Sequence, residues 1–192
     1  MINITIMAQT PQQVLEASKA QCIFCKIIEG EIPSFKIYED SKVYAFLDIN
    51  PVNAGHTLVI PKEHYIVLPQ MPDDLATHLM KVVKYLSGAI FEMTGAHGIN
   101  VFQNNGAAAG QEVPHVHFHI IPRFQDDKAI GEWKRNQIDP EKLKQMAEAM
   151  GKNLKPISSR VNLGSTTPKV TKKKKVATKR KKTIKVTKRK KL

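Results

Sequence analysis

The feature that most constrains this chain is a run over residues 115–121, His-Val-His-Phe-His-Ile-Ile, in which three imidazoles alternate with apolar side chains. Residues i, i+2 and i+4 of a strand share one face. The run therefore predicts a strand over residues 113–121 with His115, His117 and His119 on one face. Histidine titrates near neutral pH, attacks as a nucleophile and binds metals. The alternative is a strand whose polar face happens to be histidine.

The positive charge of the chain is confined to one end. Its 192 residues carry 30 Lys and Arg against 17 Asp and Glu, a formal net charge of +13. Residues 168–192 hold 14 of those bases and no acid, which leaves residues 1–167 with 16 bases and 17 acids. A segment of this composition buries too little apolar surface to offset its ordering entropy. We expect a disordered, lysine-rich tail over residues 156–192, which either binds DNA or RNA non-specifically or only aids solubility.

The distribution of apolar residues and cysteines bears on the compartment. No apolar run approaches the roughly 20 residues that a membrane span needs, and the first ten residues lack the pattern of a secretory signal. Two cysteines are too few for a disulfide framework. We therefore expect a cytoplasmic protein with no membrane partner. In a cytoplasmic protein, the C-x-x-C pair at Cys22 and Cys25 indicates metal or redox chemistry.

Hydrophobic periodicity and turn residues predict short strands around one long helix. The strands are expected over residues 35–39, 43–47, 56–60, 99–103 and 113–121, the long helix over 72–93, and shorter helices over 11–19, 22–29 and 140–150. This pattern predicts an α+β fold with an antiparallel sheet.

Four blocks of the sequence, residues 25–33, 45–49, 55–62 and 115–121, together resemble the histidine-triad (HIT) family, most closely its Hint-like branch. The resemblance covers about residues 22–123. It implies a HIT-like five-stranded antiparallel sheet with one long helix, and a homodimer. The corresponding organisation is an N-terminal helical extension over 1–21, a HIT domain over 22–125, a C-terminal helical extension over 126–155, and the tail over 156–192.

The resemblance implies catalytic roles for three histidines. His117, the middle imidazole, attacks the α-phosphorus of a nucleotide and forms a covalent nucleotidyl-histidine. A neutral imidazole suits this role because it is both a good nucleophile and a good leaving group. His119 donates to a phosphoryl oxygen, and His56 supplies a further donor. Without the resemblance, His56 would be interpreted as a capping or core histidine.

Five further residues are implied to bind a purine nucleotide. Asp48 accepts the ribose hydroxyls, while Ile27 and Phe46 enclose the base. Asn104 and Gln111 flank a loop of glycine and alanine, where backbone N–H groups can approach phosphate closely. Spacing alone would instead assign Asp48 to a turn, and Ile27 and Phe46 to the core.

One departure from the family pattern concerns proton delivery. Glu112 stands where Hint-like enzymes often carry Ser or Thr, whose hydroxyl can pass a proton to the leaving group. A carboxylate near phosphate repels it unless the carboxylate is protonated or turned away. Gln111 and His119 are the alternative proton donors.

Cys22, Cys25, His64 and His115 are candidate ligands of a structural zinc ion. A C-x-x-C pair supplies two tetrahedral ligands from one turn, and some HIT proteins carry the whole Cys-Cys-His-His set. Three alternatives are a thioredoxin-like redox pair, free buried thiols, and a catalytic zinc held by His115, His117 and His119. No organic cofactor is implied.

The sequence thus predicts a HIT-family nucleotide hydrolase or transferase. The expected substrate is a purine nucleotide, either a phosphoramidate or a dinucleoside polyphosphate. The alternative is a nucleic-acid-binding module that removes adenylate from DNA ends in the manner of aprataxin, although the zinc-finger tail of those proteins is not found here.

Overall fold

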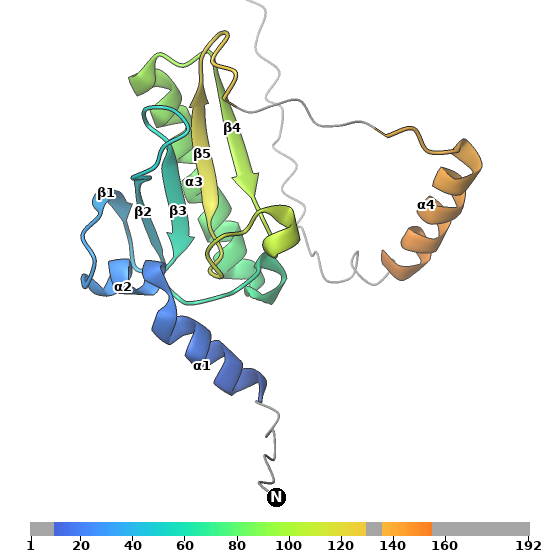
Figure 1. Ribbon diagram of the computed structural model, residues 1–192, viewed down its shortest axis with the longest axis horizontal. Coiled ribbons are helices and arrows are strands. Elements are labelled where there is room, and N and C mark those ends of the chain that lie inside the picture. The colour runs from blue at the N-terminus through green and yellow to red at the C-terminus, as the bar shows by residue number, and fades with distance from the viewer. Residues whose placement is uncertain (1–9, 130–135, 155–192) are drawn as a thin grey trace, which may run out of the picture. The chain divides into compact units, whose positions relative to one another are not determined.

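The computed structural model describes residues 10–129 and 136–154 (Figure 1). It divides into two units, one up to residue 133 and one from residue 134, and each is described by itself. The predicted tail over residues 156–192 lies outside the described residues, as do residues 1–9 of the N-terminal extension.

A five-stranded antiparallel sheet, in the order β1-β2-β3-β5-β4, forms the centre of the first unit (Figure 1). Its strands are β1 (Phe35–Glu39), β2 (Val43–Leu47), β3 (Thr57–Pro61), β4 (Gly98–Gln103) and β5 (Phe118–Arg123). Asp40 closes the β1–β2 turn, because its carboxylate accepts the backbone N–H groups of Lys42 and Val43 at 2.7 and 2.8 Å. The predicted α+β class and antiparallel sheet are confirmed.

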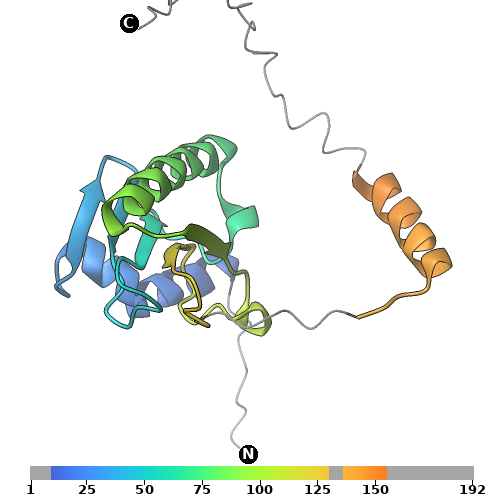
Figure 2. The ribbon, with the colours of Figure 1, turned by 90° about the horizontal axis from the view of Figure 1, so that it is seen from above.

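The long helix α3 (Asp73–Thr94) covers one face of the sheet (Figure 2). The apolar residues of α3 that recur at helical spacing are buried, and they pack against the apolar side of β5. This cluster includes Leu75, Leu79, Val82, Val83, Ile90, Val116, Phe118 and Ile120. The apolar residues of the predicted helical pattern and those of the predicted alternating pattern therefore belong to one core.

Helices α1 (Pro11–Gln21) and α2 (Ile23–Glu29) precede the sheet, and α2 packs against its other face. Thr10 caps α1, and its hydroxyl accepts the N–H of Gln13. The core on this face joins the residues between α1 and α2 to the sheet; it contains Cys22, Phe24, Cys25, Ile27, Tyr44, Phe46, Leu58 and Ile60.

The predicted strand over residues 113–121 is wrong at its start. β5 begins at Phe118, so His115 and His117 lie in the irregular segment before it. Pro114 has no N–H to give to a sheet, and the N–H of Val116 donates instead to the backbone oxygen of Tyr65 at 2.7 Å. This bend directs the His115 side chain toward the cysteines before and in α2.

The remaining elements are two short turns of the first unit and one helix of the second. Two 3-10 turns, η1 (Leu68–Gln70) and η2 (Ala107–Ala109), lie in loops of the first unit. In the second unit, α4 (Pro140–Leu154) begins after Asp139, whose carboxylate accepts the N–H of Glu141 at 2.8 Å. Within the described ranges, no helix combines the length and apolar character needed to span a bilayer.

Candidate active site and metal cluster

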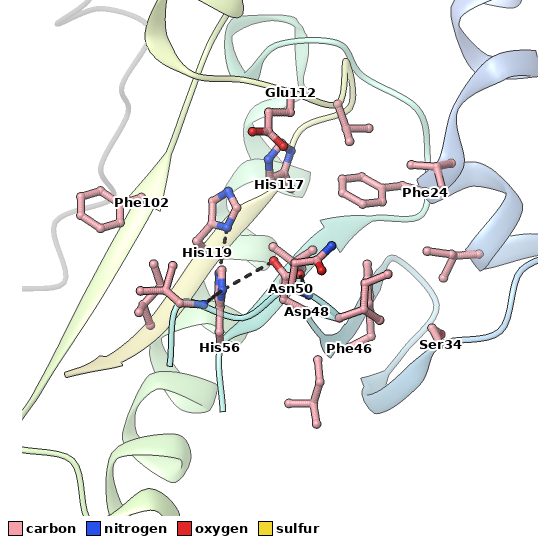
Figure 3. A pocket seen from close by; sticks show the side chains of 18 of the residues that line it. Phe24, Ser34, Phe46, Asp48, Asn50, His56, Phe102, Glu112, His117 and His119 are labelled. Carbon is pink, nitrogen blue, oxygen red and sulfur yellow. Dashed lines mark hydrogen bonds and ion pairs between the residues drawn. The ribbon is translucent and has the colours of Figure 1, made fainter. Parts of the chain in front are cut away.

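A pocket of about 650 Å³ opens on the sheet face that carries α2 (Figure 3). His56, His117, His119 and Asp48 line it, although they come from three separate segments of the chain. β2 and β3 are antiparallel neighbours, so the end of β2 and the start of β3 bring Asp48 and His56 together. β5 lies beside β3 and adds His119 opposite Leu58.

His117 is held in one tautomer. Its Nδ1 lies 2.7 Å from the backbone oxygen of His115. A carbonyl oxygen can only accept, so Nδ1 carries the hydrogen and Nε2 keeps a free lone pair. Burial lowers the pKa of His117, against opposing effects of its hydrogen bond and of the nearby Asp48 and Glu112 charges. The ring is therefore neutral at pH 7, as a nucleophile requires.

A second hydrogen-bond chain fixes His56 and His119. The backbone N–H of Val52 donates to Nδ1 of His56 at 3.2 Å, which places the hydrogen of a neutral His56 on Nε2. That Nε2 donates to Nδ1 of His119 at 3.0 Å. Nε2 of His119 then carries a hydrogen that is available to a ligand. Burial, followed by the neighbouring histidines, lowers the pKa of His119 to about 4, and burial also lowers the pKa of His56.

The two carboxylate oxygens of Asp48 have different surroundings. One oxygen accepts the N–H of Asn50 at 2.8 Å. The backbone N–H of Asp48 donates to the oxygen of His56 at 2.9 Å, which fixes the two residues relative to each other. The second carboxylate oxygen lies 3.5 Å from Nδ1 of His56.

The opposite wall of the pocket is apolar. Ile27 and Phe46, both buried, line it together with Phe24. The Phe24 ring meets Phe46 and His117 edge-on, at centroid distances of 5.8 and 5.3 Å. A planar apolar group such as a nucleobase suits a wall of this kind.

Of the two predicted loop residues, the structure brings only Asn104 into the pocket. Gln111 does not line it. Its side-chain oxygen accepts the N–H of Gly106 at 2.7 Å, and its amide donates to the oxygen of Ile66 at 2.7 Å. Both polar atoms of Gln111 thus hold the loop in shape, which corrects the expectation that its side chain faces a substrate.

Cys22, Cys25, His64 and His115 form a separate, fully buried cluster behind the pocket. The Nδ1 atoms of the two histidines are 3.2 Å apart, and sulfur-to-nitrogen distances are 3.3 to 3.6 Å. Four ligands at zinc bond lengths in a tetrahedron lie about 3.3 to 3.8 Å apart. The donor set and its spacing therefore fit a tetrahedral zinc ion.

The outer nitrogens of the cluster support this fit. Nε2 of His115 donates to the oxygen of Pro61 at 2.9 Å, and Nε2 of His64 lies 3.2 Å from the hydroxyl of Ser18. A carbonyl oxygen can only accept, so the bond to Pro61 places the ring hydrogen of His115 outside and its Nδ1 lone pair inward. The Ser18 hydroxyl can accept a hydrogen from His64 Nε2, which is the arrangement that a zinc ligand needs. The alternative zinc held by His115, His117 and His119 is wrong, because His115 turns to the cysteines.

Comparison with known proteins agrees with this geometry. The HIT domain family model matches residues 29–126. The chain is also 43% identical to the adenosine 5'-monophosphoramidase of Candida albicans over 148 residues, which are 74% of this chain and 97% of that protein. The chain belongs to the HIT family.

Solved structures of HIT proteins have the same fold. A HIT family protein from Bacillus subtilis superimposes with a TM-score of 0.66 at 43% identity, covering 70% of this chain and 97% of that one. A zinc-bound histidine triad protein from Mycobacterium smegmatis gives 0.56 at 35% identity, covering 72% and 99%.

Sequence reasoning missed two residues of this HIT protein. Phe24 connects the pocket wall to His117 and also meets His115 edge-on at 5.9 Å. Its position three residues before Ile27 on one helical face was an available signal. Ser18, which contacts His64, had no such signal, because the two residues are 46 positions apart.

Proposed function

We propose that this HIT protein hydrolyses purine nucleoside 5'-phosphoramidates at the α-phosphate, through a covalent nucleotidyl-histidine on His117. The observation that carries this proposal is the hydrogen bond from His117 Nδ1 to the oxygen of His115, which leaves Nε2 free and facing the pocket. The 43% sequence identity between this chain and the adenosine 5'-monophosphoramidase of Candida albicans supports the choice of substrate.

In this proposal, the base lies between Ile27 and Phe46, and the free oxygen of Asp48 accepts the ribose hydroxyls. The Nε2 hydrogen of His119 donates to a phosphoryl oxygen. His56 is a positioning residue, because its own Nε2 hydrogen keeps His119 in the tautomer that can donate. Asn104 and the backbone of the loop from Gly106 to Gly110 complete the phosphate end.

The reaction has two displacements at phosphorus. In the first, the lone pair of His117 Nε2 forms a bond to phosphorus while the phosphorus–nitrogen bond of the substrate breaks, and the leaving amine takes a proton. The positive imidazole of the intermediate keeps its Nδ1–H on the oxygen of His115. In the second, water attacks phosphorus, releases His117 as neutral imidazole, gives the nucleoside monophosphate and returns a proton to solvent.

Cys22, Cys25, His64 and His115 are proposed to hold a structural zinc ion, which supplies no chemistry to the reaction. Burial raises the pKa of the Cys25 thiol to about 12, and lowers that of His115 to about 4. The histidines therefore stay neutral as ligands need, while the thiols give up protons when a cation binds.

The predicted homodimer is proposed to form through β4. This strand ends the sheet and pairs only with β5 among the described residues, so its outer edge is a template for a second strand. Light scattering of the purified protein tests this, and a mass of one chain at micromolar concentration would contradict it.

A second activity is proposed for the tail, on the observation that residues 168–192 hold 14 bases and no acid. Such a segment attracts nucleic-acid phosphates without reading sequence. It would bring the hydrolase near DNA or RNA, including adenylated ends.

The experiment that tests the main proposal is a turnover comparison of the purified full-length chain. The substrates are adenosine 5'-monophosphoramidate, diadenosine tetraphosphate and adenylated DNA, with release of adenosine monophosphate as the readout. We expect the phosphoramidate to give the highest kcat/KM. Turnover of the tetraphosphate or the adenylated end alone would contradict the proposal.

A further inference from the structure

The charge of the pocket is unusual for a site that would bind several phosphates. Its lining residues, all in the described part of the chain, include two acids, Asp48 and Glu112, and no lysine or arginine. Sites for polyphosphates normally place Lys, Arg or a metal ion on the phosphates. A leaving group that carries more negative charge therefore finds no counter-ion among the described residues that line the pocket.

Glu112 is the acid at the phosphate end. It is exposed at the rim of the pocket, and its carboxylate makes no hydrogen bond or ion pair within the described ranges. Figure 3 shows Glu112 by His117, on the side away from Asp48 and Phe46. If the nucleoside occupies Asp48 and Phe46, a group bonded to its α-phosphate extends past His117 toward Glu112 and solvent.

We propose that Glu112 selects the leaving group, favouring aliphatic amines, above all those with a second positive charge, over anionic groups such as polyphosphate and sulfate. This inference rests on the proposed phosphoramidase function and adds the chemical class of the leaving group. Two observations support the inference: the carboxylate of Glu112 has no partner among the described residues, and no basic side chain of the described residues lines the pocket.

The chemistry of the step gives the physical reason. A phosphoramidate nitrogen takes a proton from solvent as the phosphorus–nitrogen bond weakens, so it becomes positive before it leaves as a neutral amine. The electron pair of the breaking bond stays on nitrogen, while the lone pair of His117 Nε2 forms the new bond to phosphorus. A fixed carboxylate stabilises the positive nitrogen as it develops. The same carboxylate repels a leaving phosphate or sulfate.

The test uses three adenosine 5'-phosphoramidates that differ only at the far end of the amine: an aminopropyl, a butyl and a carboxyethyl substituent. We expect the wild-type kcat/KM to fall in that order, with a ratio of roughly tenfold or more between the first and the last. Glu112→Gln keeps the size of the side chain and removes its charge, so the ratio should fall to nearly one. Glu92→Gln, an exposed neutralisation on α3, is the matched control and should keep the wild-type ratio.

A binding measurement makes the result independent of turnover. The β-phosphate of adenosine diphosphate is bonded to the α-phosphorus where the amine would be. Calorimetry should therefore show that Glu112→Gln strengthens binding of adenosine diphosphate several-fold more than binding of adenosine monophosphate.

The outcomes separate the two proposals. Equal ratios in the wild type and Glu112→Gln, with all three phosphoramidates turned over, would overturn the role of Glu112 and leave the phosphoramidase function standing. No turnover of any phosphoramidate would contradict the proposed function. In that case, unchanged relative binding of the diphosphate in Glu112→Gln would overturn the role of Glu112 as well.

Discussion

The backbone oxygen of His115 accepts the Nδ1–H of His117 at 2.7 Å, while the ring of the same His115 faces Cys22 at 3.4 Å. One residue thus orients the proposed nucleophile with its main chain and belongs to the buried cluster with its side chain. The cluster and the pocket are adjacent through His115, yet they use different atoms of it.

Replacing the proposed nucleophile should abolish turnover without unfolding the protein. His117→Ala is expected to lower kcat by about four orders of magnitude or more, because it removes the imidazole whose free Nε2 lone pair forms the covalent intermediate in the proposed mechanism. Rapid quenching of the wild type should trap nucleotide on His117, detected by mass spectrometry of peptides. A folded His117→Ala protein with turnover within tenfold of the wild type would rule out this mechanism.

The pH profile should extend further into acid than free histidine allows. Burial lowers the pKa of His117 below its usual value and that of His119 to about 4. The active forms are neutral, so kcat/KM should stay level as pH falls from 8 through 6.5 and decline only below the lowered pKa values. A profile that loses half its activity at pH 6.5 would show that burial does not protect these rings.

Purified protein should contain about one zinc ion per chain, held by Cys22, Cys25, His64 and His115. Removing it with a strong chelator should lower Tm, because metal affinity adds to folding stability. Ser18→Ala removes only the partner of His64 Nε2, so we expect it to weaken zinc binding by about 10- to 100-fold. The readouts are metal analysis and a chelator competition; a zinc-free native protein, or Cys22→Ala with an unchanged Tm, would argue against the site.

The basic tail should bind nucleic acid through charge alone. Binding of labelled duplex DNA by the full-length chain is expected to weaken steeply with salt, with log K falling by about 0.9 per phosphate neutralised. A chain of residues 1–167 should lose this binding and keep turnover of small nucleotides. If both proteins bind alike, or neither binds at low salt, the tail has no such role.

Local patterns were sufficient to predict most of the fold. The helical spacing of Leu75, Leu79 and Val83 specified the buried face of α3, and alternation of Phe118 with His119 specified the two faces of β5. In both cases the period of the backbone determines which side chains share a face. The four cluster residues were likewise identified before the structure, with help from the family resemblance.

Contacts between distant segments were not predictable in this way. The bend at Pro114 depends on the bond from Val116 to Tyr65, and the inward turn of Gln111 depends on the oxygen of Ile66, 45 positions earlier. A one-dimensional pattern does not contain the tertiary packing that supplies such partners. The errors at the start of β5 and at Gln111 both have this origin.

Glu112 has one more consequence, which concerns how such an enzyme can diversify. It is exposed, it lies in a segment between strands, and within the described ranges nothing in the fold depends on its carboxylate. Exchange of an exposed loop residue normally changes stability little. In the proposed role of Glu112, a substitution at this position would therefore change the preferred leaving group without lowering the stability of the fold. In such a lineage, substrate range can drift faster than architecture, and overall similarity of sequence then becomes a poor guide to the molecule that each enzyme consumes.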